Sequence, residues 1–149
     1  MFRKRKTRKG KTRRPRRVRS EVVRLQNKVW ELCKLIIRKK YLHTCYTCSA
    51  ENLEGVHLQT GHMINKKALP YYLKWDIKLL RPQCPACNKT REGMGALFYR
   101  NMSILNGQQY VDDIITDYYI LKDEKPPSLN IKINYLKDLI EKYKAILNE

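Results

Sequence analysis

The feature that most constrains this chain is a pair of Cys-x-x-Cys motifs, Cys45/Cys48 and Cys84/Cys87, separated by about 35 residues. Each motif turns two thiolates toward one metal ion, and two motifs supply the four tetrahedral ligands that structural zinc requires. Two disulfides, or four buried free thiols, are the alternatives. We favour zinc because the cysteine count of five is odd and no apolar signal segment follows the basic N-terminus. A four-thiolate zinc site is structural and has no open position for chemistry.

Hydrophobic periodicity predicts helices around this cysteine-rich centre, and hence an α+β fold. Apolar residues recur at helical spacing over residues 21–40, with Ser20 as N-cap and Cys33 as a core residue. Further helices are expected from Asn88 toward Tyr99, over 108–121, and over 134–147 after the break at Pro126-Pro127. The stretch 56–64 reads as a strand that ends near His62. We find no internal repeat.

Charge points to nucleic acid as the partner. The 149 residues hold 32 Lys and Arg against 14 Asp and Glu, a formal net charge of +18, with enough hydrophobic content (42%) for one core. No stretch is long and apolar enough to cross a membrane, and we expect a cytoplasmic protein. Residues 1–19 contain twelve basic residues and no acid, which predicts a disordered arm that binds phosphates. Its DNA-binding residues are predicted to include Arg13, Arg14, Arg16 and Arg17.

An ordered set of short motifs resembles the HNH, or His-Me finger, nucleases, and within them the NinG (Rap) family of phage recombination endonucleases. The matching residues span about residues 30–102 and are, in order, Cys45/Cys48, Gly61-His62-Met63, Pro82-Gln83-Cys84, Cys87-Asn88, Gly93 and Tyr99-Arg100. The resemblance implies a zinc-stabilised ββα-metal centre. It divides the chain into a basic arm (1–19), a nuclease domain (20–102) and a C-terminal helical extension (103–149).

Phosphodiester hydrolysis needs a base that deprotonates water and a cation that neutralises phosphate charge. His62, at a strand end, is the expected base. Asn88 resembles the family's metal-binding position, where it offers a carbonyl oxygen to catalytic Mg²⁺ (or Mn²⁺). Glu92, four residues later on the expected helix, is a second candidate ligand, inferred from helix geometry rather than from the family. The alternatives are a structural histidine at His62, a turn residue at Asn88 and a solvent-facing carboxylate at Glu92.

Two departures bear on activity. Leu79 stands where HNH proteins have an asparagine that orients the base, so Gln83 or a backbone carbonyl is expected to hold the imidazole instead. Gly61 precedes the base where the wider HNH pattern often has an acidic or His metal ligand, although a glycine there agrees with the NinG-like pattern. His57 is an odd number of residues from His62 and faces the other way on a regular strand, and His43 is expected at the surface.

These residues predict an endonuclease acting on DNA without sequence preference, and the resemblance implies branched, Holliday-junction-type substrates. Further DNA contacts are expected from Lys66, Lys67, Lys89 and Arg91. Cutting two strands in concert suggests a homodimer, to which the stripe Leu136, Leu139, Ile140 and Tyr143 offers a contact, although such a stripe is more often intramolecular core. The main alternative is a non-catalytic zinc-ribbon nucleic-acid-binding protein. A protein-interaction adaptor is the third, disfavoured by the basic arm.

Overall fold

A computed structural model describes the backbone of residues 16–149 and side chains from residue 20 onward. Its first element is helix α1 (Arg16–Lys40), whose stripe of Val22, Leu25, Val29, Leu32 and Ile36 is buried. The helix ends on Arg38, Lys39 and Lys40, where positive charge favours the negative end of the helix dipole. Helical structure is already present at Arg16, five residues before the predicted start at residue 21. Residues 16–19, assigned to a disordered arm from the sequence, are therefore helical. The rest of that predicted arm lies outside the described residues.

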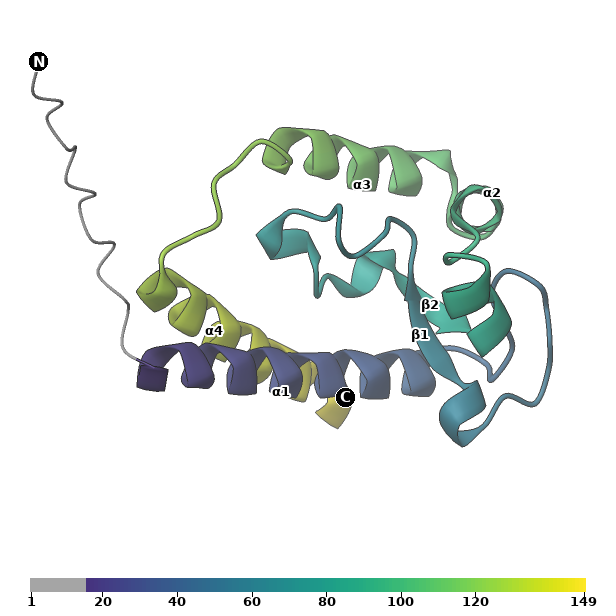
Figure 1. The fold of residues 1–149 in the computed structure, drawn as a ribbon. Helices are drawn as coiled ribbons and strands as arrows, with labels where there is room; N and C mark the ends of the chain where they lie inside the picture. Colours follow the sequence, from purple (N-terminus) through teal and green to yellow (C-terminus); the bar gives the residue numbers. More distant parts are fainter. Residues whose placement is uncertain (1–15) are drawn as a thin grey trace, which may run out of the picture.

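Helix α4 (Leu129–Asn148) packs against α1, and the two lie side by side in Figure 1. The stripe of Leu136, Leu139, Ile140 and Tyr143 is buried in the core that α4 shares with α1. The helix starts directly after Pro127-Ser128, five residues before the predicted start. Ser128 is at the N-cap position, although its side chain makes no capping hydrogen bond. This stripe is therefore intramolecular core. It does not supply a free surface for a dimer.

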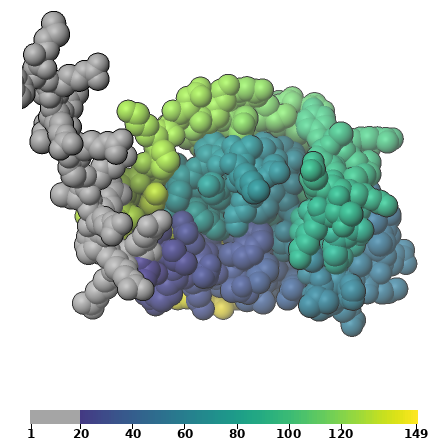
Figure 2. Space-filling model, in the orientation of Figure 1, coloured from purple at the N-terminus to yellow at the C-terminus, as the bar shows by residue number. Residues whose placement is uncertain are grey.

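Two four-residue strands form an antiparallel pair at the centre: β1 (Gln59–His62) and β2 (Leu80–Gln83). Their register places Gly61 opposite Arg81 and His62 opposite Leu80. The strand predicted over 56–64 is shorter because a 3-10 turn, η1 (Gly55–His57), precedes it. Between β1 and β2 lie the 3-10 turns η2 (Tyr71–Leu73) and η3 (Ile77–Leu79). That connection fills the space between α1 and the opposite helical layer (Figures 1 and 2).

After β2 the chain enters a short π-helical segment, η4 (Ala86–Thr90), then α2 (Gly95–Asn106) and α3 (Gln108–Leu121). The continuous helix predicted from Asn88 toward Tyr99 is interrupted, because Glu92, Gly93 and Met94 all have left-handed φ angles of 52, 85 and 54°. The bounds predicted for α3 are confirmed. A boundary expected between residues 102 and 103 falls inside α2.

The fold is thus α+β, with a small two-stranded sheet among helices, as the sequence predicts. The order strand, strand, short helix along 59–90 places His62 at the end of the first strand and Asn88 in the helical segment. Across residues 16–149, no helix is long and apolar enough to span a membrane.

Candidate functional site

The four cysteines of the two motifs meet at one point. Their Sγ atoms all lie within 4.8 Å of one another, and those of Cys48 and Cys84 are 3.8 Å apart. A tetrahedral zinc ion with Zn–S bonds of about 2.3 Å requires S···S separations of about 3.8 Å. A disulfide requires about 2 Å, and all five cysteines are free thiols. The donor set and its spacing therefore suit one structural metal ion such as zinc.

Local hydrogen bonds favour the thiolate form of one of these cysteines, Cys45. Burial acts to raise the pKa of Cys45, but hydrogen bonds from the Thr47 hydroxyl and from backbone amides outweigh it and lower that pKa to about 6. The Cys45 Sγ lies 3.4 Å from the Thr47 hydroxyl. Thiolate is the ligand form, so Cys45 is disposed to bind a metal. In Cys48 a backbone hydrogen bond at Ala50 acts to lower the pKa, but burial and the neighbouring cysteine thiols outweigh it and raise that pKa to about 12. Cys33, by contrast, is buried in the α1 core, with its Sγ 3.4 Å from the Trp75 carbonyl oxygen.

Gln83 joins the three segments that surround the cysteines. Its buried amide Nε2 donates to the Thr47 hydroxyl (3.1 Å) and to the Gly93 carbonyl (2.8 Å). A Cβ at Gly61 would lie 1.8 Å from the Gln83 Oε1, so this strand position requires glycine. Gln83 is therefore engaged in the scaffold. The expectation that it holds the His62 imidazole is wrong.

A backbone carbonyl holds that imidazole, the other alternative left open by the sequence. The His62 Nε2 lies 3.1 Å from the Lys74 carbonyl oxygen, and its ring stacks on Trp30 with centroids 5.3 Å apart and planes at 11°. A carbonyl oxygen only accepts, so Nε2 bears the proton and Nδ1 is left with a free lone pair. Burial, together with the positive charge of Lys66, lowers the pKa of His62 to about 4, although the Lys74 contact acts to raise it. The ring is thus neutral at pH 7.

A basic depression of about 600 Å³ opens beside this histidine, between α1, β1 and η4. Its charged lining residues are Lys34, Arg38 and Lys89, and no acidic residue lines it. Lys34 pairs with Glu31 (2.6 Å), whereas within the described chain Arg38 and Lys89 have no ion-pair partner. A pocket with unneutralised cations and no carboxylate attracts phosphate.

The depression brings Asn88 and the surroundings of His62 to the same region. Thr60 and Asn88 line it, and Thr60 shares a strand face with His62 because the two are two residues apart. Trp30 both lines the depression and stacks on His62. The Asn88 Nδ2 donates to the Gln59 Oε1 (2.9 Å), which leaves the Asn88 Oδ1 available as a ligand or acceptor.

The remaining predicted site residues are dispersed. Glu92 does not lie one helical turn after Asn88, because η4 ends at Thr90 and Glu92 adopts a left-handed conformation in the following turn. Among the described residues, the four cysteines are the only group of three or more His, Cys, Asp or Glu ligands. Lys67 and Arg91 are exposed, and the Lys66 Nζ lies 4.4 Å from the Trp30 ring centroid. Arg13 and Arg14 lie outside the described residues, and Arg16 and Arg17 form the first turn of α1.

The burial or exposure of Leu79, His43 and His57 settles where these residues lie relative to the site. Leu79 is buried in the core, and its carbonyl accepts from the Met63 amide, so it has no contact role toward the imidazole. His43 and His57 are exposed. The roles of Thr47, of the Gln83 amide and of the Lys74 carbonyl were missed, because neither a buried hydrogen-bond bridge nor a backbone oxygen has a signature in a single sequence.

Comparisons of the chain with protein-family models, with curated proteins and with solved structures gave no match.

Proposed function

We propose that this protein is a zinc-stabilised endonuclease of the HNH type that hydrolyses phosphodiester bonds in DNA. The observation that carries the proposal is the state of His62: a neutral imidazole at the end of β1, with Nε2 held by the Lys74 carbonyl at 3.1 Å and Nδ1 free to accept a proton. A neutral, oriented imidazole is what general-base activation of water requires. The resemblance to the NinG family adds the expectation of branched, four-way-junction substrates.

The neighbouring residues have complementary roles in this proposal. Arg38 and Lys89 bind the phosphates of the scissile strand in the basic depression, close to Trp30 and His62. Bound phosphate also brings negative charge near the imidazole, which raises the pKa of His62 from its low value in the free protein. His62 is thereby a stronger base when substrate is present than when it is absent.

The described residues do not form a complete site for a second, catalytic ion. Asn88 offers one oxygen, and no carboxylate cluster accompanies it. Mg²⁺ commonly binds through few protein ligands together with substrate phosphates and water, so we assign Asn88 to an ion that arrives with the DNA. Such an ion supplies charge neutralisation at the phosphate and the leaving oxygen.

One specific observation favours the alternative of a non-catalytic nucleic-acid-binding protein. The His62 ring is largely buried against Trp30, and its low pKa makes it a weak base in the free protein. In that case His62 is a packing residue, and the basic depression only binds backbone phosphates.

A cleavage assay distinguishes the endonuclease from the non-catalytic nucleic-acid-binding protein. Zinc-loaded protein is incubated with a labelled four-way junction and with linear duplex, in Mg²⁺, Mn²⁺ or EDTA, beside His62→Gln and the matched control His57→Gln, which changes an exposed histidine. We expect cleavage that needs the divalent ion, disappears in His62→Gln and persists in His57→Gln. Binding without cleavage in any lane would refute the enzyme and support the alternative.

A further inference from the structure

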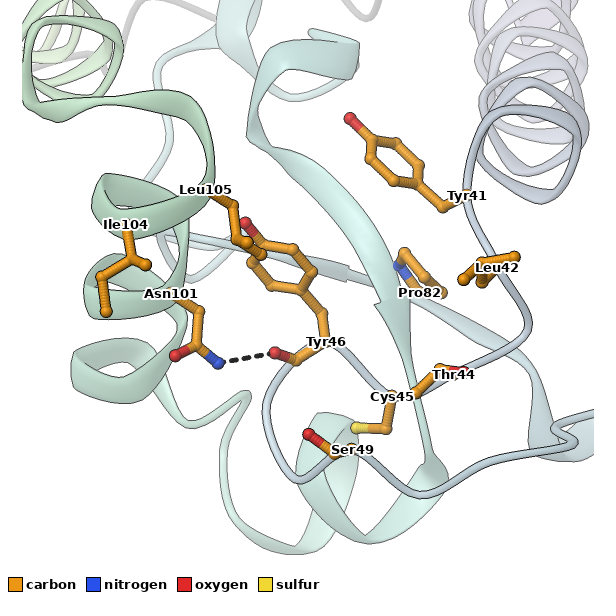
Figure 3. Close-up of a pocket in the computed structure, with 10 residues that line it drawn as sticks. All are labelled: Tyr41, Leu42, Thr44, Cys45, Tyr46, Ser49, Pro82, Asn101, Ile104 and Leu105. Atoms are coloured by element: carbon orange, nitrogen blue, oxygen red, sulfur yellow. Dashed lines mark hydrogen bonds between the residues drawn. The ribbon is translucent and has the colours of Figure 1, made fainter.

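A second depression, of about 450 Å³, lies between the first cysteine motif and α2, next to β2. In Figure 3, α2 supplies one wall and the segment after α1 supplies the other, with Pro82 of β2 between them. Its apolar lining residues are Tyr41, Leu42, Tyr46, Pro82, Ile104 and Leu105.

The mouth of this tyrosine pocket is unusually apolar for so basic a chain. Leu42, Ile104 and Leu105 are exposed by 84, 67 and 69% of their surface. Polar groups are few and sit among these side chains. The Asn101 Nδ2 donates to the Tyr46 carbonyl (2.7 Å), as Figure 3 shows, so its Oδ1 is free to accept, and Thr44 and Ser49 contribute hydroxyls. Apolar faces with a few hydrogen-bonding groups suit a flat, heteroaromatic ligand.

A buried cation lies directly against the two tyrosines. The Arg81 side chain is fully buried, with its Cζ 4.8 Å from the Tyr41 ring centroid and 5.5 Å from that of Tyr46. Its Nη atoms donate to the carbonyls of Lys78 and Leu80 and to the Asn106 Oδ1. Its Nε has no hydrogen-bond partner, and no carboxylate of the described chain forms an ion pair with it.

This arrangement selects the charge of the ligand. A buried guanidinium without a carboxylate leaves positive potential in a low-dielectric region, and the Lys40 Nζ adds a second cation 5.7 Å from the Tyr41 ring centroid. No acidic residue lines the pocket. The ligand that fits aromatic walls and an excess of positive charge is an aromatic ring attached to an anion.

We propose that the tyrosine pocket binds an unpaired nucleobase of the nucleic-acid substrate, stacked against Tyr41 or Tyr46. Base–aromatic stacking tolerates any base, which agrees with the DNA binding without sequence preference that we predict from the sequence. The pocket is adjacent to the basic depression, because Pro82 lines the first, Thr60 lines the second, and the two residues are paired across the strands. One strand of DNA can therefore place its phosphates in the depression and a base in the pocket. This inference rests on the proposed function and adds a preference for substrates with unpaired bases.

The test compares two labelled DNAs of equal length and charge, one fully paired and one with a single unpaired base. Fluorescence anisotropy gives Kd for each with the full chain, with Ile104→Glu at the pocket mouth, and with Ile120→Glu on α3. Ile120→Glu is the matched control, because Ile120 is also a helical isoleucine, undergoes the same charge change and is exposed by 66% of its surface, against 67% for Ile104. Stacking of one base is worth about 1–3 kcal/mol, so we expect the protein to bind the unpaired-base DNA about tenfold more tightly. Ile104→Glu should abolish that ratio and Ile120→Glu should retain it.

Equal binding of both DNAs by the full chain would overturn the proposal, as would an unchanged ratio in Ile104→Glu. A change of oligomeric state in Ile104→Glu, seen by sedimentation, would assign the pocket to a second copy of the chain instead. Cleavage measured on the same samples separates the two ideas. Tighter binding of the unpaired-base DNA without cleavage refutes the catalytic proposal and supports base binding in the tyrosine pocket. Cleavage without tighter binding of that DNA refutes only base binding in the pocket. No binding to either DNA refutes both.

Discussion

Protonation of His62 should destabilise the folded protein, because its ring is largely buried and lies near Lys66. The pKa of His62 falls from 6.5 to about 4 on folding. Between these values the unfolded chain binds a proton that the folded chain does not, so the contribution of His62 is favourable above pH 6.5 and is lost as pH falls toward 4. The full difference corresponds to about 3 kcal/mol, of which about 1.4 kcal/mol is already lost at about pH 5.5.

The assay is urea unfolding of zinc-loaded protein at about pH 7.5 and about pH 5.5. His62→Gln lacks the titrating group, whereas His57→Gln changes only an exposed histidine. We expect the wild type and His57→Gln to lose about 1.4 kcal/mol more than His62→Gln over this interval. Nitrogen-15 NMR of the imidazole should also place the proton of the neutral ring on Nε2. Equal pH dependence in all three proteins, or a proton on Nδ1, would show that the Lys74 contact and the burial of the ring are misjudged.

Three further changes test the scaffold and the depression. Cys84→Ser should reduce zinc content below one ion per chain and unfold the central region, since structural zinc contributes a free energy comparable to the whole stability of a typical domain. A mutant that stays folded and unfolds cooperatively, measured by circular dichroism, would contradict the structural site. Gly61→Ala should lower the free energy of unfolding by about 2 kcal/mol or more, because the new Cβ displaces the doubly hydrogen-bonded Gln83 amide. The double mutant with Gln83→Ala should lose less free energy of unfolding than the sum of the two single mutants. Additive losses would argue against the clash. For DNA binding, Lys89→Gln should reduce the slope of log K (the binding constant) against log salt concentration by about one. An unchanged slope would show that the basic depression does not contact the DNA phosphates.

The helices were largely predictable because their signal is local. The 3.6-residue period marks the buried stripes of α1 and α4, and the bounds of α3 agree with the prediction. The interruption between η4 and α2 was not predictable in the same way. It needs consecutive left-handed residues, two of which, Glu92 and Met94, are types that rarely adopt that conformation.

The cysteine ligands of the metal site were predictable from the sequence, whereas the groups that hold and surround the other site residues were not. Two Cys-x-x-Cys motifs are sufficient to predict the cluster that the structure brings within 4.8 Å. The group that orients His62 is a backbone oxygen on the connection between the strands, which any residue at Lys74 would supply. The burial of Arg81 against the Tyr41 and Tyr46 rings was not predictable, because burial of a cation depends on distant aromatic partners that no local pattern indicates.

The most direct test of the account is the single-turnover rate at which zinc-loaded protein cleaves a four-way junction in Mg²⁺, measured beside His62→Gln at saturating protein. The account predicts a rate lower by about a hundredfold or more in the variant, with zinc content and junction Kd unchanged. An equal rate in the two proteins, or no cleavage by the wild type with any divalent ion, would contradict it.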